Sequence, residues 1–248
     1  MRIAISQPTY LPWCGYFDLI DQVHKFVVLD NVQFERRSWQ HRNRIKTPTG
    51  LQWLTVPVQY HGRFSQSIQD VQLRDIGFAG KHLRAIELNY RRAPFFEKYF
   101  PALQRLLPCQ VGSKLVDLNL RLLQWLCDAL QLNVSFVRAS ALSATGKRTE
   151  LLANICVELG ATEYLSPIGS ADYLLSEMEL LTARDVAVTF QHYDHPQYRQ
   201  LFSPFLPYAC VLDLLFNEGP GALEIIRSGR RPALPPADLS LSHGAQAG

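Results

Sequence analysis

Residues 1–30 read MRIAISQPTYLPWCGYFDLIDQVHKFVVLD, and this stretch decides the fold. The apolar segments 2–6 and 26–30 predict two buried strands. Between them, two prolines constrain a loop, and the spacing of apolar residues over 15–23 predicts a helix. Strand, loop, helix and strand in this order indicate a Rossmann-like βαβ unit with two parallel strands.

The rest of the chain repeats this alternation. It predicts helices over 81–107 with breaks at Pro94 and Pro101, over 115–130 and 149–159, from 171, and over 212–216; the predicted strands are 52–58, 134–137, 163–166 and 186–190. The expected fold class is α/β, with a mainly parallel sheet flanked by helices. We expect one α/β domain over 1–231, and the Pro-, Ala- and Ser-rich segment 232–248 predicts a mobile tail.

Composition limits the class of protein. The chain has 248 residues, 47% of them hydrophobic, which is enough to bury the core of a globular protein. Its five widely spaced cysteines form neither a disulfide framework nor a zinc motif, so we expect reduced thiols in the cytoplasm and no metal site. No apolar run reaches spanning length, so no membrane insertion is expected.

A local excess of positive charge is more informative than the net charge of +3. The segment 35–46 has one acid, Glu35, and five cations: Arg36, Arg37, Arg42, Arg44 and Lys46. One interpretation is a solvated face. Together with Trp39 and Asn43, however, the cations suit a phosphorylated ligand that carries a base or a sugar. RNA uses the same residue types, but it normally requires a longer basic stripe.

Several polar residues follow the predicted strands. Ligands of open α/β sheets bind outside the carboxyl ends of the strands, so Gln7, Tyr10, Asp30 and Gln33 are expected near one crevice. The loop 7–16 leads into a helix N-terminus, which favours an anion. This loop is similar in shape to that of nucleotidylyltransferase-type enzymes, although Gly15 is followed by tyrosine instead of histidine. Structural packing of its aromatic residues is the alternative.

Candidate catalytic groups each have a structural alternative. His192 and His195 follow a predicted strand and could shuttle protons or bind metal, or they could be satisfied structural residues. Asp30 is a candidate base or merely caps a loop, and Cys14 is a candidate nucleophile or an inert core thiol. The segment 146–149 lacks the serine or threonine of a P-loop and is better explained as a helix start.

A family resemblance rests on motifs spread along the chain. They are Gln7-Pro8-x-Tyr10-x-Pro12-x-x-Gly15-Tyr16-Phe17, Asp30-Asn31-Val32-Gln33-Phe34, Trp39-x-x-Arg42-Asn43-x-Ile45-Lys46 and Trp53-Leu54-Thr55-Val56-Pro57-Val58, followed by Ser166, Tyr193, His195 and Leu212-Asp213. With these motifs the chain resembles the WbqC-like protein family. The resemblance implies a bacterial protein associated with surface polysaccharide (O-antigen) or specialised-metabolite biosynthesis.

Our inference from this resemblance is transfer of an acyl or aminoacyl group, such as glycyl, to the amine of an amino-sugar nucleotide or similar acceptor. Asp30 or His195 would deprotonate the amine, and Gln7 and Asn43 would stabilise the oxyanion. The predicted substrate contacts are Tyr10, Gly15, Gln33, Trp39, Arg42, Asn43, Lys46, Ser166 and Tyr193. The cofactor stays open between ATP and an activated acyl donor.

Three functions therefore compete. A transferase predicts a pocket in which Gln7, Tyr10, Asp30, Arg42, Asn43 and His195 converge on a phosphorylated or nucleotide-linked small molecule. An ATP-dependent amide ligase predicts that ATP is consumed. A module that docks aminoacyl-tRNA or a partner protein predicts salt-sensitive RNA binding without turnover of small molecules alone.

Overall fold

The computed structural model describes residues 1–63 and 65–239 of the chain. Its strands are β1 (Arg2–Ser6), β2 (Lys25–Val28), β3 (Arg42–Thr47), β4 (Gly50–Thr55), β5 (Ser135–Arg138), β6 (Glu163–Ser166) and β7 (Ala187–Phe190). Its α-helices are α1 (Cys14–Asp21), α2 (Phe78–Tyr90), α3 (Phe96–Leu106), α4 (Leu115–Ala129), α5 (Thr149–Glu158), α6 (Ala171–Ser176), α7 (Glu179–Thr182), α8 (Val211–Glu218) and α9 (Ala222–Ser228).

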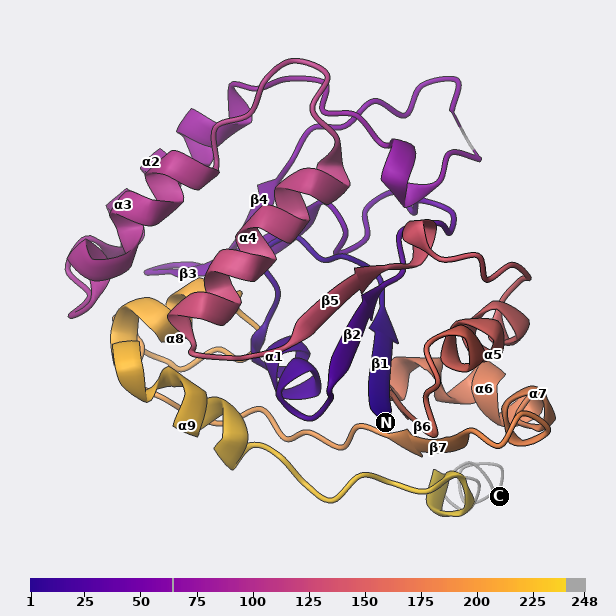
Figure 1. Ribbon diagram of the computed structural model, residues 1–248. Helices are drawn as coiled ribbons and strands as arrows, with labels where there is room; N and C mark the ends of the chain where they lie inside the picture. Colours follow the sequence, from indigo (N-terminus) through magenta and orange to yellow (C-terminus); the bar gives the residue numbers. More distant parts are fainter. Residues whose placement is uncertain (64, 240–248) are drawn as a thin grey trace, which may run out of the picture.

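Five strands form one parallel sheet in the order β5-β2-β1-β6-β7. This arrangement, shown in Figure 1, confirms the predicted α/β class with its N-terminal βαβ unit. From β1 the chain builds outward to β2 and β5 on one side, then crosses to β6 and β7 on the other. The strand order therefore reverses between β1 and β6, and this switch point is where ligands of such sheets bind.

Two helical layers cover the sheet because its central strands are apolar on both faces. On one face, Ala4 and Phe26 pack with α1, α4 and α8 in the larger hydrophobic cluster. On the other, Ile3, Ile5 and Val27 pack with α5, α6 and α7. Figure 1 shows these layers on opposite sides of the sheet. The side-chain alternation of each strand thus divides the core into two parts.

The segment between β2 and α2 forms an antiparallel hairpin, β3–β4, outside the main sheet. The charged sequence of β3 does not predict a strand, because only its inward residues are apolar or amide. Asn43 and Ile45 are buried on the inner face, whereas Arg42 and Arg44 alternate with them on the outer face. β4 ends at Thr55, before Pro57, which accords with the effect of proline on strand pairing.

Two further boundaries differ from the sequence-based expectation. The predicted helical segment breaks near Pro94, but Pro101 lies inside α3, where Tyr99, Phe100 and Leu103 hold both halves of the helix against the core. The second difference is at residues 232–239 of the predicted tail: Phe190 and Leu234 exchange backbone hydrogen bonds of 2.8 and 2.9 Å. Residues 240–248 of that predicted tail lie outside the described residues.

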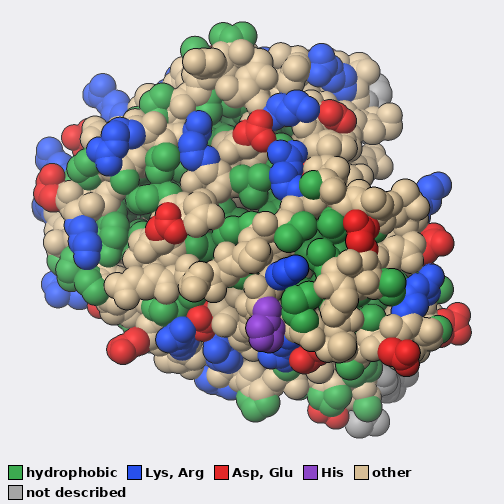
Figure 2. Space-filling view, in the orientation of Figure 1, with side chains coloured by type: hydrophobic (Ala, Val, Ile, Leu, Met, Phe, Trp, Pro, Cys, Tyr) green, Lys and Arg blue, Asp and Glu red, His purple; other side chains and the backbone are tan. Residues whose placement is uncertain are grey.

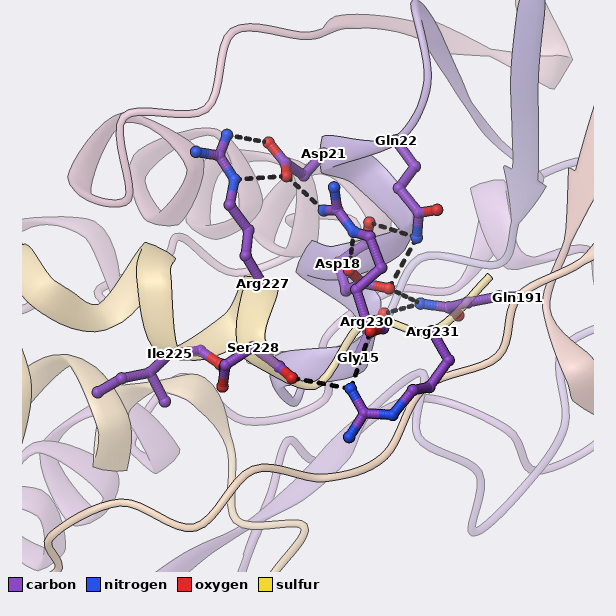
Figure 3. Close-up of polar contacts among 10 residues, drawn as sticks. All are labelled: Gly15, Asp18, Asp21, Gln22, Gln191, Ile225, Arg227, Ser228, Arg230 and Arg231. Atoms are coloured by element: carbon purple, nitrogen blue, oxygen red, sulfur yellow. Dashed lines mark hydrogen bonds and ion pairs between the residues drawn. The ribbon is translucent and has the colours of Figure 1, made fainter. Parts of the chain in front are cut away.

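Ion pairs connect α1 to the end of α9 (Figure 3). Arg230 Nε donates to the buried Asp18 at 2.7 Å, and Arg227 donates twice to Asp21, at 2.8 and 2.7 Å. Gln191 Nε2 donates to the carboxylate of Asp18 at 2.7 Å. Burial raises the pKa of Asp18, and the hydrogen bond from Arg230 opposes that rise. The C-terminal helix is thereby fixed to the first helix.

Within the described residues, no helix combines the length and apolar character that crossing a bilayer requires.

Candidate functional site

A cavity of about 440 Å³ lies at the carboxyl ends of β1 and β6, at the switch point. Gln7 follows β1, and Pro167 and Ser170 follow β6. The segment after β2 contributes Glu35 and Gln40 to the lining. The fold therefore gathers polar side chains from three segments at the edge where open α/β sheets bind ligands.

Two further cavities adjoin this central cavity and share lining residues with it. The aromatic chamber, of about 380 Å³, shares Thr9 and Trp39; its lining is Thr9, Trp13, Tyr16, Trp39, Asn43, Arg44 and Tyr208. The basic cavity, of about 620 Å³, shares Gln7, Leu29, Glu35, Leu152 and Tyr173, and adds Gln33, Lys147 and Arg148 among others. We call these three cavities together the switch-point cleft. Figure 2 shows the outline of the molecule indented at the upper right, above the α5–α7 layer.

The basic cavity ends at the N-terminus of α5. Lys147 and Arg148 line it there, and no side chain caps the first turn of the helix. The Thr149 hydroxyl, fully buried in the same turn, lacks a hydrogen-bond partner within the described part of the chain. Two cations and uncapped backbone N–H groups make this end of the cleft suitable for an anion.

The middle of the cleft contains one carboxylate and one oriented amide. Glu35 is the only acid that lines the three cavities among the described residues. Gln40 Nε2 donates to Gln7 Oε1 at 2.8 Å, which orients the Gln7 amide and leaves its Nε2 donor for a ligand. The cleft thus pairs a proton acceptor with a hydrogen-bond donor across the same cavity.

Of the predicted contacts, Gln7, Gln33, Trp39 and Asn43 line the cleft. Asn43, however, has its polar atoms committed to the protein. Its Nδ2 donates to the carbonyl oxygens of Tyr10 and Leu11 at 3.2 and 2.8 Å, and its Oδ1 accepts from Arg44 N at 2.8 Å. The structure therefore gives Asn43 the role of holding the loop after β1, with no donor left for an oxyanion.

Asp30 is fully buried and fully hydrogen-bonded. Its carboxylate accepts from Arg138 Nε at 2.6 Å, from Ser140 N at 2.9 Å and from Ser140 Oγ at 2.8 Å. These contacts tie the end of β2 to the end of β5. They match the loop-capping alternative, and they leave the carboxylate no approach to an amine in the cleft.

Tyr10 belongs to the core instead of the pocket. Its side chain is fully buried, and its hydroxyl lies 2.8 Å from Nδ1 of His82. The six residues expected to converge for a transferase are therefore not brought together. A polar side chain that follows a strand can find its hydrogen-bond partner on a helix distant in sequence. For Tyr10 this helix is α2, which carries His82.

The buried His82 predicts a pH dependence of stability. Burial lowers its pKa from 6.5 to about 4 in the folded protein. The unfolded chain then binds the proton more tightly, so the contribution of His82 is complete above about pH 6.5 and is lost as the pH falls toward 4.

Between about pH 7 and pH 5, the free energy of unfolding of wild type is expected to fall by about 2 kcal/mol more than that of His82→Gln, as measured by urea unfolding. His24→Gln, at an exposed histidine, is the matched control. Equal losses in wild type and His82→Gln would show that His82 is protonated in the folded state.

His195 and Tyr193 lie in an aromatic cluster beside the cleft. The His195 ring stacks on Trp13, with centroids 5.9 Å apart and an interplanar angle of 14°. Its Nδ1 donates to the Pro196 carbonyl at 2.9 Å, and burial lowers its pKa. Tyr193 meets Trp13 edge to face. Tyr193 and His195 line a separate hollow that shares Tyr208 with the aromatic chamber.

Five other candidates are placed outside the cleft or within the packing. Lys46 is buried and its Nζ donates to the Thr47 carbonyl at 3.4 Å, and the Ser166 hydroxyl pairs with Ser170. Gly15 is covered by the Trp13 ring, which a Cβ there would meet at 2.3 Å. Cys14 is buried, which raises its pKa and makes it an inert thiol instead of a nucleophile. Arg42 stacks on Trp53 at the outer face of the hairpin.

Sequence reasoning misses Glu35, Lys147, Arg148 and Tyr173 as cleft residues. A signal for Lys147 and Arg148 exists, because they precede a helix that follows a strand, the position that holds anions in α/β sheets. The P-loop pattern, which residues 146–149 do not match, does not include this signal. Tyr173 reaches the cleft from α6.

Comparison with known proteins identifies the family of the chain. The family model described as "WbqC-like protein family" matches residues 7–225. The "Uncharacterized protein Rv1507c" of Mycobacterium tuberculosis (strain ATCC 25618 / H37Rv) is 38% identical over 231 residues, which cover 93% of this chain and 99% of that protein. No solved structure matches this chain. By the extent of the family match and of this relative, the chain belongs to the WbqC-like protein family.

Proposed function

We propose that the protein is a biosynthetic enzyme that binds a nucleotide-linked or otherwise phosphorylated amine in the switch-point cleft and transfers an acyl or aminoacyl group to that amine. The observation that carries the proposal is the composition of the cleft along its length. An aromatic chamber with Arg44 occupies one end, Gln7 and Glu35 the middle, and Lys147 and Arg148 the other end.

Charge and position favour a phosphorylated ligand. Arg148 is two-thirds exposed at the rim, where its Nε lies 3.8 Å from a Glu177 carboxylate oxygen and its guanidinium lies over the Tyr173 ring at 5.8 Å. This exposure leaves guanidinium N–H groups accessible to phosphate oxygens. The uncapped first turn of α5 adds backbone donors. A phosphate at this end would leave the rest of the small molecule in the central cavity, beside Glu35 and Gln7.

The chemistry of the central cavity suits acyl transfer to an amine. Glu35 would accept the proton that the amine loses as it attacks the acyl carbonyl. Gln7 Nε2, oriented by Gln40, would donate to the oxygen on which negative charge develops. Glu35 thereby takes the role that sequence reasoning assigns to Asp30 or His195. The biosynthetic setting, surface polysaccharide or specialised metabolites, belongs to the same proposal.

The test removes the anion end of the cleft. The double variant Lys147→Ala/Arg148→Ala is expected to bind a UDP-linked 2-amino sugar at least tenfold more weakly than wild type, because two charge-assisted contacts are lost. Isothermal titration calorimetry measures the affinity. The matched control is Lys98→Ala/Arg105→Ala, which removes the same charge from the surface of α3.

Unchanged affinity in the Lys147/Arg148 variant would show that this end holds no phosphate. Activity is followed by mass spectrometry of the sugar nucleotide with candidate acyl donors, and Glu35→Gln is expected to lose transfer while keeping affinity. Consumption of ATP in that reaction would instead favour the amide ligase.

A further inference from the structure

The outer face of the β3–β4 hairpin carries an exposed stack of arginine and tryptophan side chains. The Arg42 guanidinium lies 4.3 Å from the Trp53 ring centroid, and that of Arg44 lies 5.3 Å from the Trp39 ring and 5.4 Å from the Trp53 ring. Trp39 and Trp53 are 47% and 42% exposed, although large apolar rings are usually buried. We call these four residues the Arg–Trp face.

The charges of this face are not neutralised by the protein. Within the described residues, no carboxylate forms an ion pair with Arg42 or Arg44. Their Nε atoms, shielded from solvent, also lack hydrogen-bond partners there. Planar cations beside exposed indole rings are the groups that bind phosphates and stack on bases.

A cationic pocket extends the surface beyond the hairpin. This cavity of about 470 Å³ is lined by four cations, Arg36, Arg37, Arg74 and Lys81, and by one acid, Asp75. The Asp75 carboxylate accepts a hydrogen bond from Gly77 N at 2.8 Å, and the four cations outnumber this single acid. Thr55 lines this pocket and pairs with Arg42 across the hairpin, so the pocket and the Arg–Trp face are contiguous.

The same face leads into the switch-point cleft. Trp39 and Arg44 belong to the Arg–Trp face and also line the aromatic chamber. A single-stranded nucleic acid whose phosphates lie on the cationic pocket and on Arg42 and Arg44, and whose bases stack on the exposed tryptophan rings, would therefore place its end in the chamber. A small acyl donor that fits within the cleft would make no contact with the cationic pocket or with Trp53.

From this continuity we infer that the activated donor of the proposed transfer is an aminoacyl ester at the 3′ end of an RNA, whose single-stranded end lies along the Arg–Trp face. This inference rests on the proposed function and names its donor class. The exposed rings favour RNA over an acidic protein, because single-stranded bases stack on aromatic side chains whereas carboxylates do not.

The transfer step is balanced without a further co-reactant. The acceptor amine forms a C–N bond to the ester carbonyl carbon, and the C–O bond to the terminal ribose breaks. The proton that the amine loses passes to Glu35 and then to the departing ribose oxygen. The products are an amide and the deacylated RNA.

Fluorescence anisotropy with a labelled RNA hairpin that ends in a short single-stranded 3′ segment tests the inference. Arg42→Ala/Arg44→Ala is expected to weaken binding at least tenfold and to reduce the slope of log K against log salt by about 1.4. Trp53→Ala is expected to weaken binding about tenfold with an unchanged slope, and Trp53→Phe to restore most of it. Lys98→Ala/Arg105→Ala is the charge-matched control.

The inference is overturned by equal affinity for a blunt RNA duplex, by an unchanged salt slope in Arg42→Ala/Arg44→Ala, or by tighter binding of a labelled poly-glutamate peptide than of RNA. The UDP-linked 2-amino sugar separates this inference from the proposed function. If the sugar nucleotide binds and the RNA does not, the donor is a small carrier and the proposed function stands. If the sugar nucleotide fails to bind, the proposed function itself is wrong.

Discussion

Asp30→Ala is expected to lower the free energy of unfolding by about 3 kcal/mol, because it leaves the Arg138 guanidinium and the Ser140 hydroxyl without their shared acceptor. Asp30 is fully buried, whereas the Arg138 side chain is 34% exposed and can recover part of its hydration. For that reason the expected loss of stability lies at the lower end of the range seen when one partner of a buried ion pair is removed. Urea unfolding monitored by circular dichroism measures the change.

A catalytic role for Asp30 would give a different pattern. Asp30→Asn preserves size, so a residue acting only as a base would leave stability near wild type while abolishing transfer. Asp117→Ala is the matched control, because its carboxylate contacts the same Arg138 from an exposed position and its loss is expected to cost less than about 1 kcal/mol. An Asp30→Asn variant that is as stable as wild type but inactive would show that Asp30 is a catalytic residue.

Asp213→Ala is expected to cost about 4 kcal/mol of stability, the largest effect we foresee for a single carboxylate. Asp213 is fully buried and accepts from Tyr90 at 2.9 Å and from Tyr198 and Gln200 at 2.8 Å. Burial raises the pKa of Asp213, and its hydrogen bonds and Lys46 oppose that rise. The substitution would leave three donors unpaired and the buried Lys46 amine without a neighbouring charge.

The conservative variant separates charge from hydrogen bonding. Asp213→Asn keeps one acceptor oxygen, so we expect a smaller loss than in Asp213→Ala, measured as the shift of the urea midpoint at constant slope. Asp128→Ala serves as control, because it removes an exposed carboxylate that accepts a hydrogen bond from Gln124 Nε2 at 2.9 Å. If Asp213→Ala is no less stable than this control, the hydrogen bonds to Asp213 do not stabilise the folded protein.

The architecture follows from hydrophobic pattern, but the hairpin does not. Each strand of the parallel sheet contains at least two consecutive apolar residues, so the alternation of strands with helices can be predicted from the sequence. β3 is different, because Arg42 and Arg44 face outward while the inward Asn43 is polar and satisfies loop carbonyls. A strand whose polar residues serve tertiary contacts carries no strand signal in its sequence.

The position of the site follows from the strand ends and is predictable from the sequence. The hydrogen-bond partners of individual side chains in the site are not. The switch-point rule correctly places Gln7 and Gln33 at one cleft. The same rule wrongly places Asp30 and Tyr10 in the cleft. Their side chains instead contact Arg138 and His82, which are distant in sequence. Spacing along the chain contains no information on such pairings, so it also misses Glu35 as the carboxylate that remains in the cleft.

The strand order has a consequence for synthesis of the chain. β1 and β2 pair through the short α1, but β5, which covers the other edge of β2, comes only after the hairpin and three long helices. During translation the apolar edge of β2 therefore stays unpaired until the hairpin, the three helices and β5 have been synthesised. Such long-range parallel pairing slows folding, and β2 is the segment through which nascent chains would aggregate.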